Sequence, residues 1–472
     1  SLKVIAGISE KNAEKFSELT ETNKDQVEKL TISAIQNAEN TLEDSQRIAN
    51  VVAIADDELA NKVVEEVSKT AVEEKQSLSI KVLKAIVDTQ PEKIENINED
   101  IKEDLIEKAI EATKDQQEGN LIEEEDLTDA VTDIIVKTDT TTAAKMIEEI
   151  NEIDTETNLS LEVISGISEK DSGKINELSN NNKEQMDELT IDAIQKAENT
   201  SEDSELIANV VAVVNNDLVN VMIEEVSKVS IEEKQTLSAK VLQKIVETEP
   251  DKINIINKDV KSTIIKQTVN VSKQQEEGII SDEENLIDIV SDIISKTDSE
   301  TAIEVIEEVN DTETETNLSL KIGASIAEKS NQKLNDLSNI DKEEVDKLLE
   351  KAVQSAESTN EDSNLIAKVV SVANDELANK VVDEVSKTST DDKQDLSAKV
   401  LKAIVDTEPS KIEILNAEIK DKVIEQAIDA AKDQQENLTE GQTLSTEDDL
   451  TDVVADIVTK ADNDTAAKVL ET

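Results

Sequence analysis

The side chains in this sequence that could do chemistry are almost all carboxylates. The chain contains 110 aspartate and glutamate residues, but no histidine, cysteine, tyrosine or tryptophan. Those absent residue types supply the proton shuttles, nucleophiles and soft metal ligands of many enzymes. Paired carboxylates can hydrolyse glycosides, yet so many acids make any one pairing uninformative, and no tyrosine or tryptophan is available to stack on a sugar. The sequence therefore predicts a protein that is not an enzyme and has no catalytic residues.

Phosphate-binding loops are absent as well. Neither GxGxxG nor GxxxxGK[ST] occurs in the sequence, so no backbone cradle for a nucleotide is predicted. The absence of cysteine also excludes disulfides and cysteine-ligated zinc. We therefore expect no cofactor-binding residues and no cofactor.

Three acidic segments could in principle attract divalent cations. DTETET, starting at Asp311, has acids at alternate positions like the start of a calcium loop, but Thr316 stands where the turn needs glycine. The segments Glu123–Asp126 and Asp282–Glu284 concentrate carboxylates and are interpreted as solvated loops, with loose cation collection as the alternative. The sequence predicts no defined metal site.

The charge balance limits the possible partners. The 49 basic residues leave a net charge of −61, and Arg47 is the only arginine. Nucleic acids are held by lysine and arginine and by aromatic stacking, so binding to them is excluded. Any protein partner should be basic. The longest apolar run, Val210–Val214, is far short of the roughly 20 residues that a spanning helix needs, so we expect no membrane insertion.

The elements that carry these acids are organised as a long repeat. The segment SLKVIAGISEK at Ser1 returns as SLEVISGISEK at Ser160 and as SLKIGASIAEK at Ser319, which gives a period of 159 residues. The three prolines occupy one equivalent position, where each should start a short helix after a break. These are Pro91, Pro250 and Pro409. We therefore divide the chain into repeat 1 (1–159), repeat 2 (160–318) and a truncated repeat 3 (319–472).

Each repeat is itself a divergent pair of roughly 80-residue halves. The segment at Leu78, LSIKVLKAI, resembles LSLEVISGI at Leu159, and the stretches at Leu365 and Leu396 resemble one helical hairpin copied again. Apolar residues recur with helical spacing, and their stripes are too narrow for a helix to be buried alone. The sequence therefore predicts an all-α fold: an elongated tandem-repeat α-solenoid, a superhelix of stacked helical hairpins with no sheet.

Several recurring positions predict local structure. Thr41, Thr200 and Thr359 each precede an aspartate by three residues, which is the pattern of a capping box at a helix start. Glycines are expected in exposed connections. These are Gly119, Gly278 and Gly441, the last in a loop that is five residues longer. Phe16 and Met222 are replaced by aliphatic residues in the other repeats, which predicts core positions.

The predicted role follows from the architecture and from what is missing. Both ends of the chain fall inside helical patterns, so we expect a section of a longer array or copies that join head to tail. The main hypothesis is a structural spacer or filament-forming segment, with an extracellular or cell-surface location suggested by a long acidic array without cysteine. The alternative is a binding solenoid or scaffold that presents an acidic face to a basic protein.

The excess of negative charge predicts that salt stabilises the fold. The Debye length is about 8 Å at physiological ionic strength and about 30 Å at 0.01 M, so dilution lets many repeats repel one another. Lowering the salt concentration should lower the melting temperature, and a few millimolar calcium should reverse that change if the acidic loops collect cations. Thermal melts across a sodium chloride series measure this. A melting temperature that is flat or falls with added salt would contradict the prediction.

Overall fold

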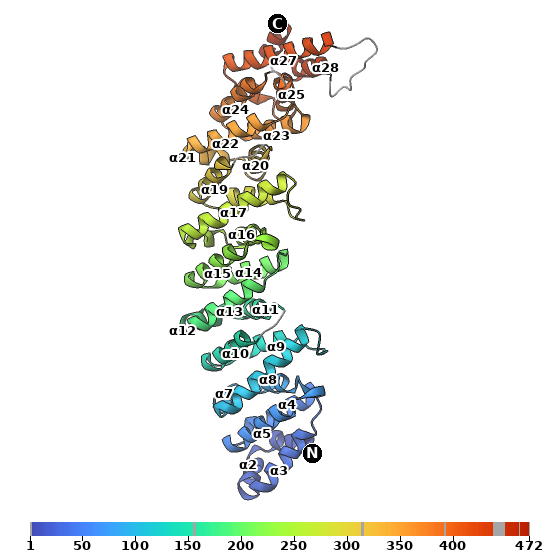
Figure 1. Cartoon of the computed structure of the whole chain (residues 1–472), viewed down its shortest axis with the longest axis vertical. Coiled ribbons are helices and arrows are strands. Elements are labelled where there is room, and N and C mark those ends of the chain that lie inside the picture. Colours follow the sequence, from blue (N-terminus) through green and yellow to red (C-terminus); the bar gives the residue numbers. More distant parts are fainter. Residues whose placement is uncertain are drawn as a thin grey trace. The chain divides into compact units, whose positions relative to one another are not determined.

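The computed structural model describes residues 2–153, 157–312, 316–390, 393–437, 449–461 and 463–471. Within these residues the secondary structure is helical and includes no strand. The chain divides into two compact units, residues 1–237 and 238–472, which we describe separately. Figure 1 shows that each unit is built from two rows of helices, here called the A row and the B row.

In the first compact unit, successive helices of each row pack against one another, and each A helix is followed along the chain by a B helix. The A row consists of α1 (Leu2–Lys11), α4 (Leu42–Ile54), α6 (Leu78–Thr89), α9 (Leu127–Lys137), α11 (Leu159–Lys170) and α14 (Ser201–Val213). The B row consists of α3 (Lys24–Gln36), α5 (Asp57–Thr70), α8 (Glu99–Gln117), α10 (Thr140–Glu152), α13 (Lys183–Lys196) and α15 (Asn216–Val229). Every second hairpin carries a short helix between its two long ones; these are α2 (Ala13–Thr22), α7 (Glu92–Glu95) and α12 (Ser172–Asn181). Two 3₁₀ turns, η1 (Glu73–Lys75) and η2 (Glu232–Lys234), follow α5 and α15.

The second compact unit has the same organisation and starts with α16 (Leu237–Thr248). Its A row continues with α18 (Leu286–Lys296), α20 (Leu318–Lys329), α23 (Asn360–Val372), α25 (Leu396–Thr407) and α28 (Leu450–Lys460). Its B row is α17 (Lys258–Glu276), α19 (Ser299–Asp311), α22 (Lys342–Ser355), α24 (Asp375–Thr388), α27 (Ala417–Asn437) and α29 (Asn463–Glu471). The short helices are η3 (Pro250–Ile255), α21 (Lys333–Ile340) and α26 (Ser410–Glu413).

The core is aliphatic and lies between the two rows. On α5 the residues Leu59, Val63 and Val67 form one buried stripe, as their helical spacing predicts. Helix α6 is buried on more of its surface, because it packs against α4 and α9 in its own row and against α8 of the B row. Phe16 and Met222 are buried, as predicted. The predicted all-α solenoid of stacked hairpins is confirmed, while its elongated overall shape stays a prediction.

The predicted helix starts are confirmed with one difference. The hydroxyl of Thr41 accepts a hydrogen bond from the backbone N–H of Asp44 at 3.2 Å, and Thr200 and Thr359 form the same cap at 3.1 Å. In a capping box the acid would bond back to the N–H of the threonine itself. Here the Asp44 carboxylate accepts from the N–H of Glu39 at 2.9 Å, because the N–H of Thr41 already donates to the Glu39 carbonyl.

The prolines start the short helices, as predicted: α7 and α26 begin directly after Pro91 and Pro409, and η3 begins at Pro250.

On four of the short helices, α7, α12, α21 and α26, a lysine bonds a backbone carbonyl at the end of an earlier A helix. We call these residues the stapling lysines. Lys93 donates to Ala55 at 2.8 Å, Lys174 to Thr138 at 2.7 Å, Lys333 to Thr297 at 2.7 Å and Lys411 to Ala373 at 2.5 Å. Each places an ammonium group at the negative end of a helix dipole.

Glycine and glutamine together close the long connection after α8 and α17. Gly119 and Gly278 adopt positive φ angles of 75° and 70°, which glycine tolerates at a helix end. The amide side chain of a glutamine then accepts from the first N–H of the next A helix. Gln116 bonds Leu127, Gln275 bonds Leu286 and Gln434 bonds Leu450, at 2.7, 2.8 and 2.7 Å. Gly441 lies outside the described residues.

Replacing a buried stapling lysine should destabilise the fold. Lys174 is 7% exposed, and Lys174→Met would leave the Thr138 carbonyl without its charged donor. A hydrogen bond of this kind contributes about 1.5–3 kcal/mol, so we expect a loss of that order in the free energy of unfolding, measured with urea. The equivalent Lys15 is exposed and pairs with Glu18, so Lys15→Met is the matched control and should change little. Equal losses in both variants would show that the carbonyl bond is not the cause.

Candidate functional site

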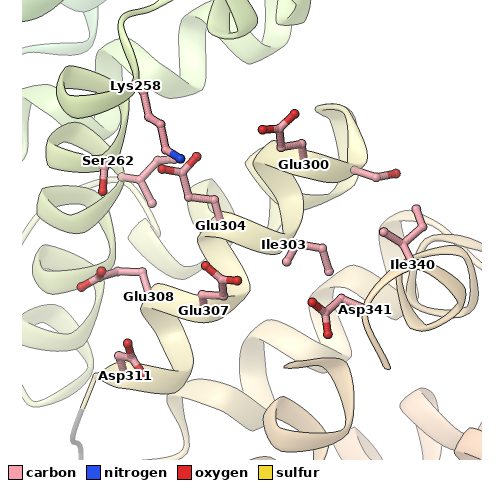
Figure 2. A pocket seen from close by; sticks show the side chains of 12 residues that line it. Lys258, Ser262, Glu300, Ile303, Glu304, Glu307, Glu308, Asp311, Ile340 and Asp341 are labelled. Atoms are coloured by element: carbon pink, nitrogen blue, oxygen red, sulfur yellow. The ribbon is translucent and has the colours of Figure 1, made fainter. Parts of the chain in front are cut away.

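The candidate site is a hollow on the B row of the second compact unit, between α17, α19 and the corner where α21 meets α22. Its volume is about 590 Å³. Figure 2 shows carboxylates from α19 along one wall and Lys258 and Ser262 of α17 on the other. We call it the B-row hollow. It is lined by Lys258, Ser262, Ile265, Ser299, Glu300, Ile303, Glu304, Glu307, Glu308, Asp311, Ile340 and Asp341.

Three isoleucines make part of this lining apolar. Ile265 and Ile303 belong to the core and are 2% and 8% exposed. Ile340, the last residue of α21, is 61% exposed and lies at the opposite rim (Figure 2). An exposed isoleucine beside core residues offers a small apolar surface to a partner, although a single exposed residue is common on soluble proteins.

Lysines partly neutralise the carboxylates of the hollow. Glu304 lies 3.4 Å from Lys261, Glu308 lies 3.8 Å from Lys266, and Asp311 lies 3.4 Å from Lys347. Lys258 also points toward Glu304 in Figure 2. These partners come from α17 on one side and α22 on the other, so the acids of α19 connect it to both neighbours in the row.

Two further carboxylates have no such partner. Within the part of the chain that the structure describes, no lysine lies within ion-pair distance of Glu300 or Glu307, and both are exposed. Partial burial raises the pKa of Glu307, and the negative charges of Glu344 and Asp341 raise it further. Asp341 caps α22 by accepting from the N–H of Glu344 at 3.2 Å. A positively charged group of a partner would therefore be attracted to the side of the hollow where Glu307 lies.

The chemistry available here is recognition of cations. The hollow has carboxylates, one lysine, two serines and aliphatic side chains, and no cluster of ligands that could hold a metal ion occurs among the described residues. Glu300 and Glu307 are two helical turns apart on one face of α19, so both can contact one elongated partner.

The acidic loops considered from the sequence bond mainly to the protein itself. Glu123 pairs with Lys81 at 2.7 Å, Glu125 pairs with Lys84 at 2.6 Å, and Asp282 pairs with Lys240 at 3.1 Å. Burial acts to raise the pKa of Glu123, but hydrogen bonds from Lys81 and Ser77 outweigh it and lower that pKa. These loop acids tie the long loops to lysines of A-row helices, a role that the interpretation as solvated loops did not predict. The DTETET segment falls in part outside the described residues.

The sequence analysis predicted no binding residues, so it missed the B-row hollow. One signal was available in the repeat itself. Glu304 stands where the other two repeats have Lys145 and Lys468, and Ile340 stands where they have Thr22 and Asn181. Such single-copy departures mark positions where one copy has acquired a different surface.

No protein-family model and no curated protein matches the chain. Among solved structures it is similar to Kap121p bound to Nup53p, with a TM-score of 0.38 and 11% identity over 99% of this chain and 55% of that one. It thus spans about half of that protein's chain. A circular tandem repeat protein gives 0.27 and 14% over 94% and 98% of the two chains, and importin beta gives 0.21 and 10% over 100% and 74%. The likeness is one of helical-repeat architecture alone. In the described residues, no helix has the length and apolarity required to traverse a bilayer.

The charge of Glu307 should cost stability at neutral pH. Its pKa is raised in the folded chain, so folding favours the protonated form, and the stability contribution falls as pH rises through the folded pKa. We expect Glu307→Gln to raise the melting temperature at pH 7, with the difference shrinking as the pH falls through the raised folded pKa and vanishing below about 4.3, the ordinary value for glutamate. Glu14→Gln, an exposed change on α2, controls for net charge. An equal gain in both variants would contradict a local effect.

Proposed function

We propose that this chain is a non-enzymatic helical-repeat scaffold that binds a basic protein segment on its B row, with the B-row hollow as the principal contact. The observation that supports this most directly is the combination of apolar lining with two carboxylates, Glu300 and Glu307, for which no described lysine lies within ion-pair distance. A bound lysine or arginine would supply the missing positive charges.

The composition of the hollow favours a protein segment over a small cation. A simple ion would use the carboxylates and leave the exposed Ile340 uncovered. A segment with an apolar side chain beside lysines or arginines would cover Ile340 and reach Glu300 and Glu307 together. Electrostatic attraction from the acidic surface would speed the encounter, and the apolar contact would slow release.

A rigid surface is what such binding requires. The stapling lysine Lys333 lies on α21, the helix that also carries Ile340, and bonds the Thr297 carbonyl at the end of α18. Asp311 of α19 and Lys347 of α22 form an ion pair across the next contact in the row. These two contacts hold α21 and α19 in place, so little ordering cost should fall on the partner.

The spacer or filament role, the cell-surface location and head-to-tail joining remain predictions from the sequence. They share the scaffold architecture but require no occupied surface. A binding scaffold and a spacer differ in one measurable respect, because only the former should recognise a basic segment at a defined place.

Binding of a synthetic helical peptide with one leucine flanked by lysines at i±4 tests the proposal. We expect titration calorimetry to detect binding to the full chain in 50 mM sodium chloride, weakened but still measurable at 300 mM. The Glu300→Lys, Glu307→Lys double variant should weaken affinity at least tenfold. Glu107→Lys with Glu148→Lys makes the same charge change on the B row of the first compact unit and should weaken it much less.

Two outcomes would overturn the proposal. The first is no binding at 50 mM salt. The second is an equal loss of affinity in both double variants, which would mean that the peptide follows the overall negative charge. A peptide with alanine in place of leucine should bind more weakly if the isoleucines contribute.

A further inference from the structure

Helices α8 and α10 of repeat 1 pack against each other, and the charges at their contact have a defined order, with acids on the first helix and a lysine on the second. Glu99, Glu103 and Glu107 recur every fourth residue along α8 and form an acidic stripe. Lys145 of α10 forms ion pairs with both Glu99 and Glu103. In this repeat the first helix of the pair is negative and the second supplies the positive charge.

Repeat 2 has the opposite sense at the equivalent positions. Helix α17 carries Lys258, Ser262 and Lys266 where α8 has its three glutamates. Helix α19 carries Glu304 where α10 has Lys145. Glu304 lies 3.4 Å from Lys261, which is the equivalent of Lys102 on α8 and is therefore common to both repeats. Further along the same two helices, Lys266 and Glu308 are 3.8 Å apart.

Repeat 3 returns to the sense of repeat 1. Asp421 of α27 occupies the position of Glu103, and Lys468 of α29 occupies the position of Lys145. These two residues form an ion pair. At the position of Lys145 each copy thus places opposite charges against each other, whereas further along the helices of repeat 1 Glu149 of α10 lies near Glu107 of α8.

The apolar contacts between the same helices do not distinguish the copies. The inward residues of α8 and α17 include Ile106 in one and Ile265 in the other, and those of α10 and α19 include Ile147 and Ile306. Side chains of equal shape can replace one another with little loss. A chain of similar repeats therefore needs another way to specify which helix packs on which.

We propose that the inverted charge sense of repeat 2 is a register code that keeps α10 on α8 and α19 on α17 during folding. Packing of α19 on α8 would keep a lysine beside Glu304, Lys102 in place of Lys261, but would replace Lys258 and Ser262 with Glu99 and Glu103. Packing of α10 on α17 would place Lys145 against Lys258. Exposed ion pairs add little to stability, but facing like charges disfavour the wrong pairing, which is how charged positions specify partners in coiled coils.

The test gives repeat 2 the charge sense of repeat 1. The variant Lys258→Glu, Ser262→Glu, Glu304→Lys copies Glu99, Glu103 and Lys145, so native pairs stay complementary while wrong pairs are no longer penalised. We expect a melting temperature close to that of the unchanged chain. After dilution from urea at low salt, we expect the yield of native protein to fall at least twofold, with an added slow phase. Circular dichroism and limited proteolysis report yield and rate.

Two controls separate the code from simple stability. Glu304→Lys alone places like charges in the native contact and should lower the melting temperature. In 1 M sodium chloride, where charges are screened over about 3 Å, the unchanged chain should refold as poorly as the triple variant. Because refolding needs no partner, the result does not depend on the binding proposal.

The reciprocal variant guards against a failure of the triple variant to fold. Glu99→Lys, Glu103→Ser, Lys145→Glu gives repeat 1 the sense of repeat 2 while native pairs stay complementary, and its refolding yield should fall in the same way. Refolding of either variant with the yield and rate of the unchanged chain at low salt would overturn the proposal.

Discussion

The structure depends on one constraint: a single helical hairpin of this sequence cannot bury its own apolar stripes. Helix α6 illustrates it, because it needs α4 and α9 beside it in the A row and α8 across the core before its aliphatic residues are covered. Stability therefore resides in the interfaces between hairpins. Aliphatic residues satisfy this constraint almost alone, with Phe16 as the single aromatic residue of the sequence, since each interface is thin and repeated.

The same constraint decides where the charges can be placed. The two helices of each hairpin use their inner faces for stacking, so most acids of the described residues lie on the outer faces of the rows and in the loops, with Glu225, Asp362 and Glu384 among the buried exceptions. Most of the lysines then serve the protein itself, as straps such as Lys81 with Glu123, or as pairs across neighbouring helices such as Lys145 with Glu99. The acids that form no such ion pair among the described residues make the surface negatively charged, and Glu307 is one of them.

The sequence predicted the helical class, the helix starts at the capping threonines and the core positions of Phe16 and Met222, because these depend on local spacing. It could not predict the stapling lysines, since Lys174 and Thr138 belong to helices that meet only after two hairpins have stacked. The B-row hollow was missed for a related reason. Its lining comes from three helices and from Asp341 between α21 and α22, and side-chain geometry decides which carboxylates of this lining have a lysine within ion-pair distance. The substitution at Glu304 was visible, but its meaning required knowing which helix faces it.

The stapling lysines bond main-chain carbonyls, and this choice of acceptor affects how the array can evolve. Their acceptors belong to Ala55, Thr138, Thr297 and Ala373, residues of different type that all present the same group. A carboxylate partner disappears with one codon change, whereas a carbonyl survives almost any substitution. The bonds of the stapling lysines can thus be retained while the residues of the outer surfaces are substituted. Duplicated copies of such a chain can therefore acquire different surface residues while the lysine–carbonyl bonds between their hairpins stay the same.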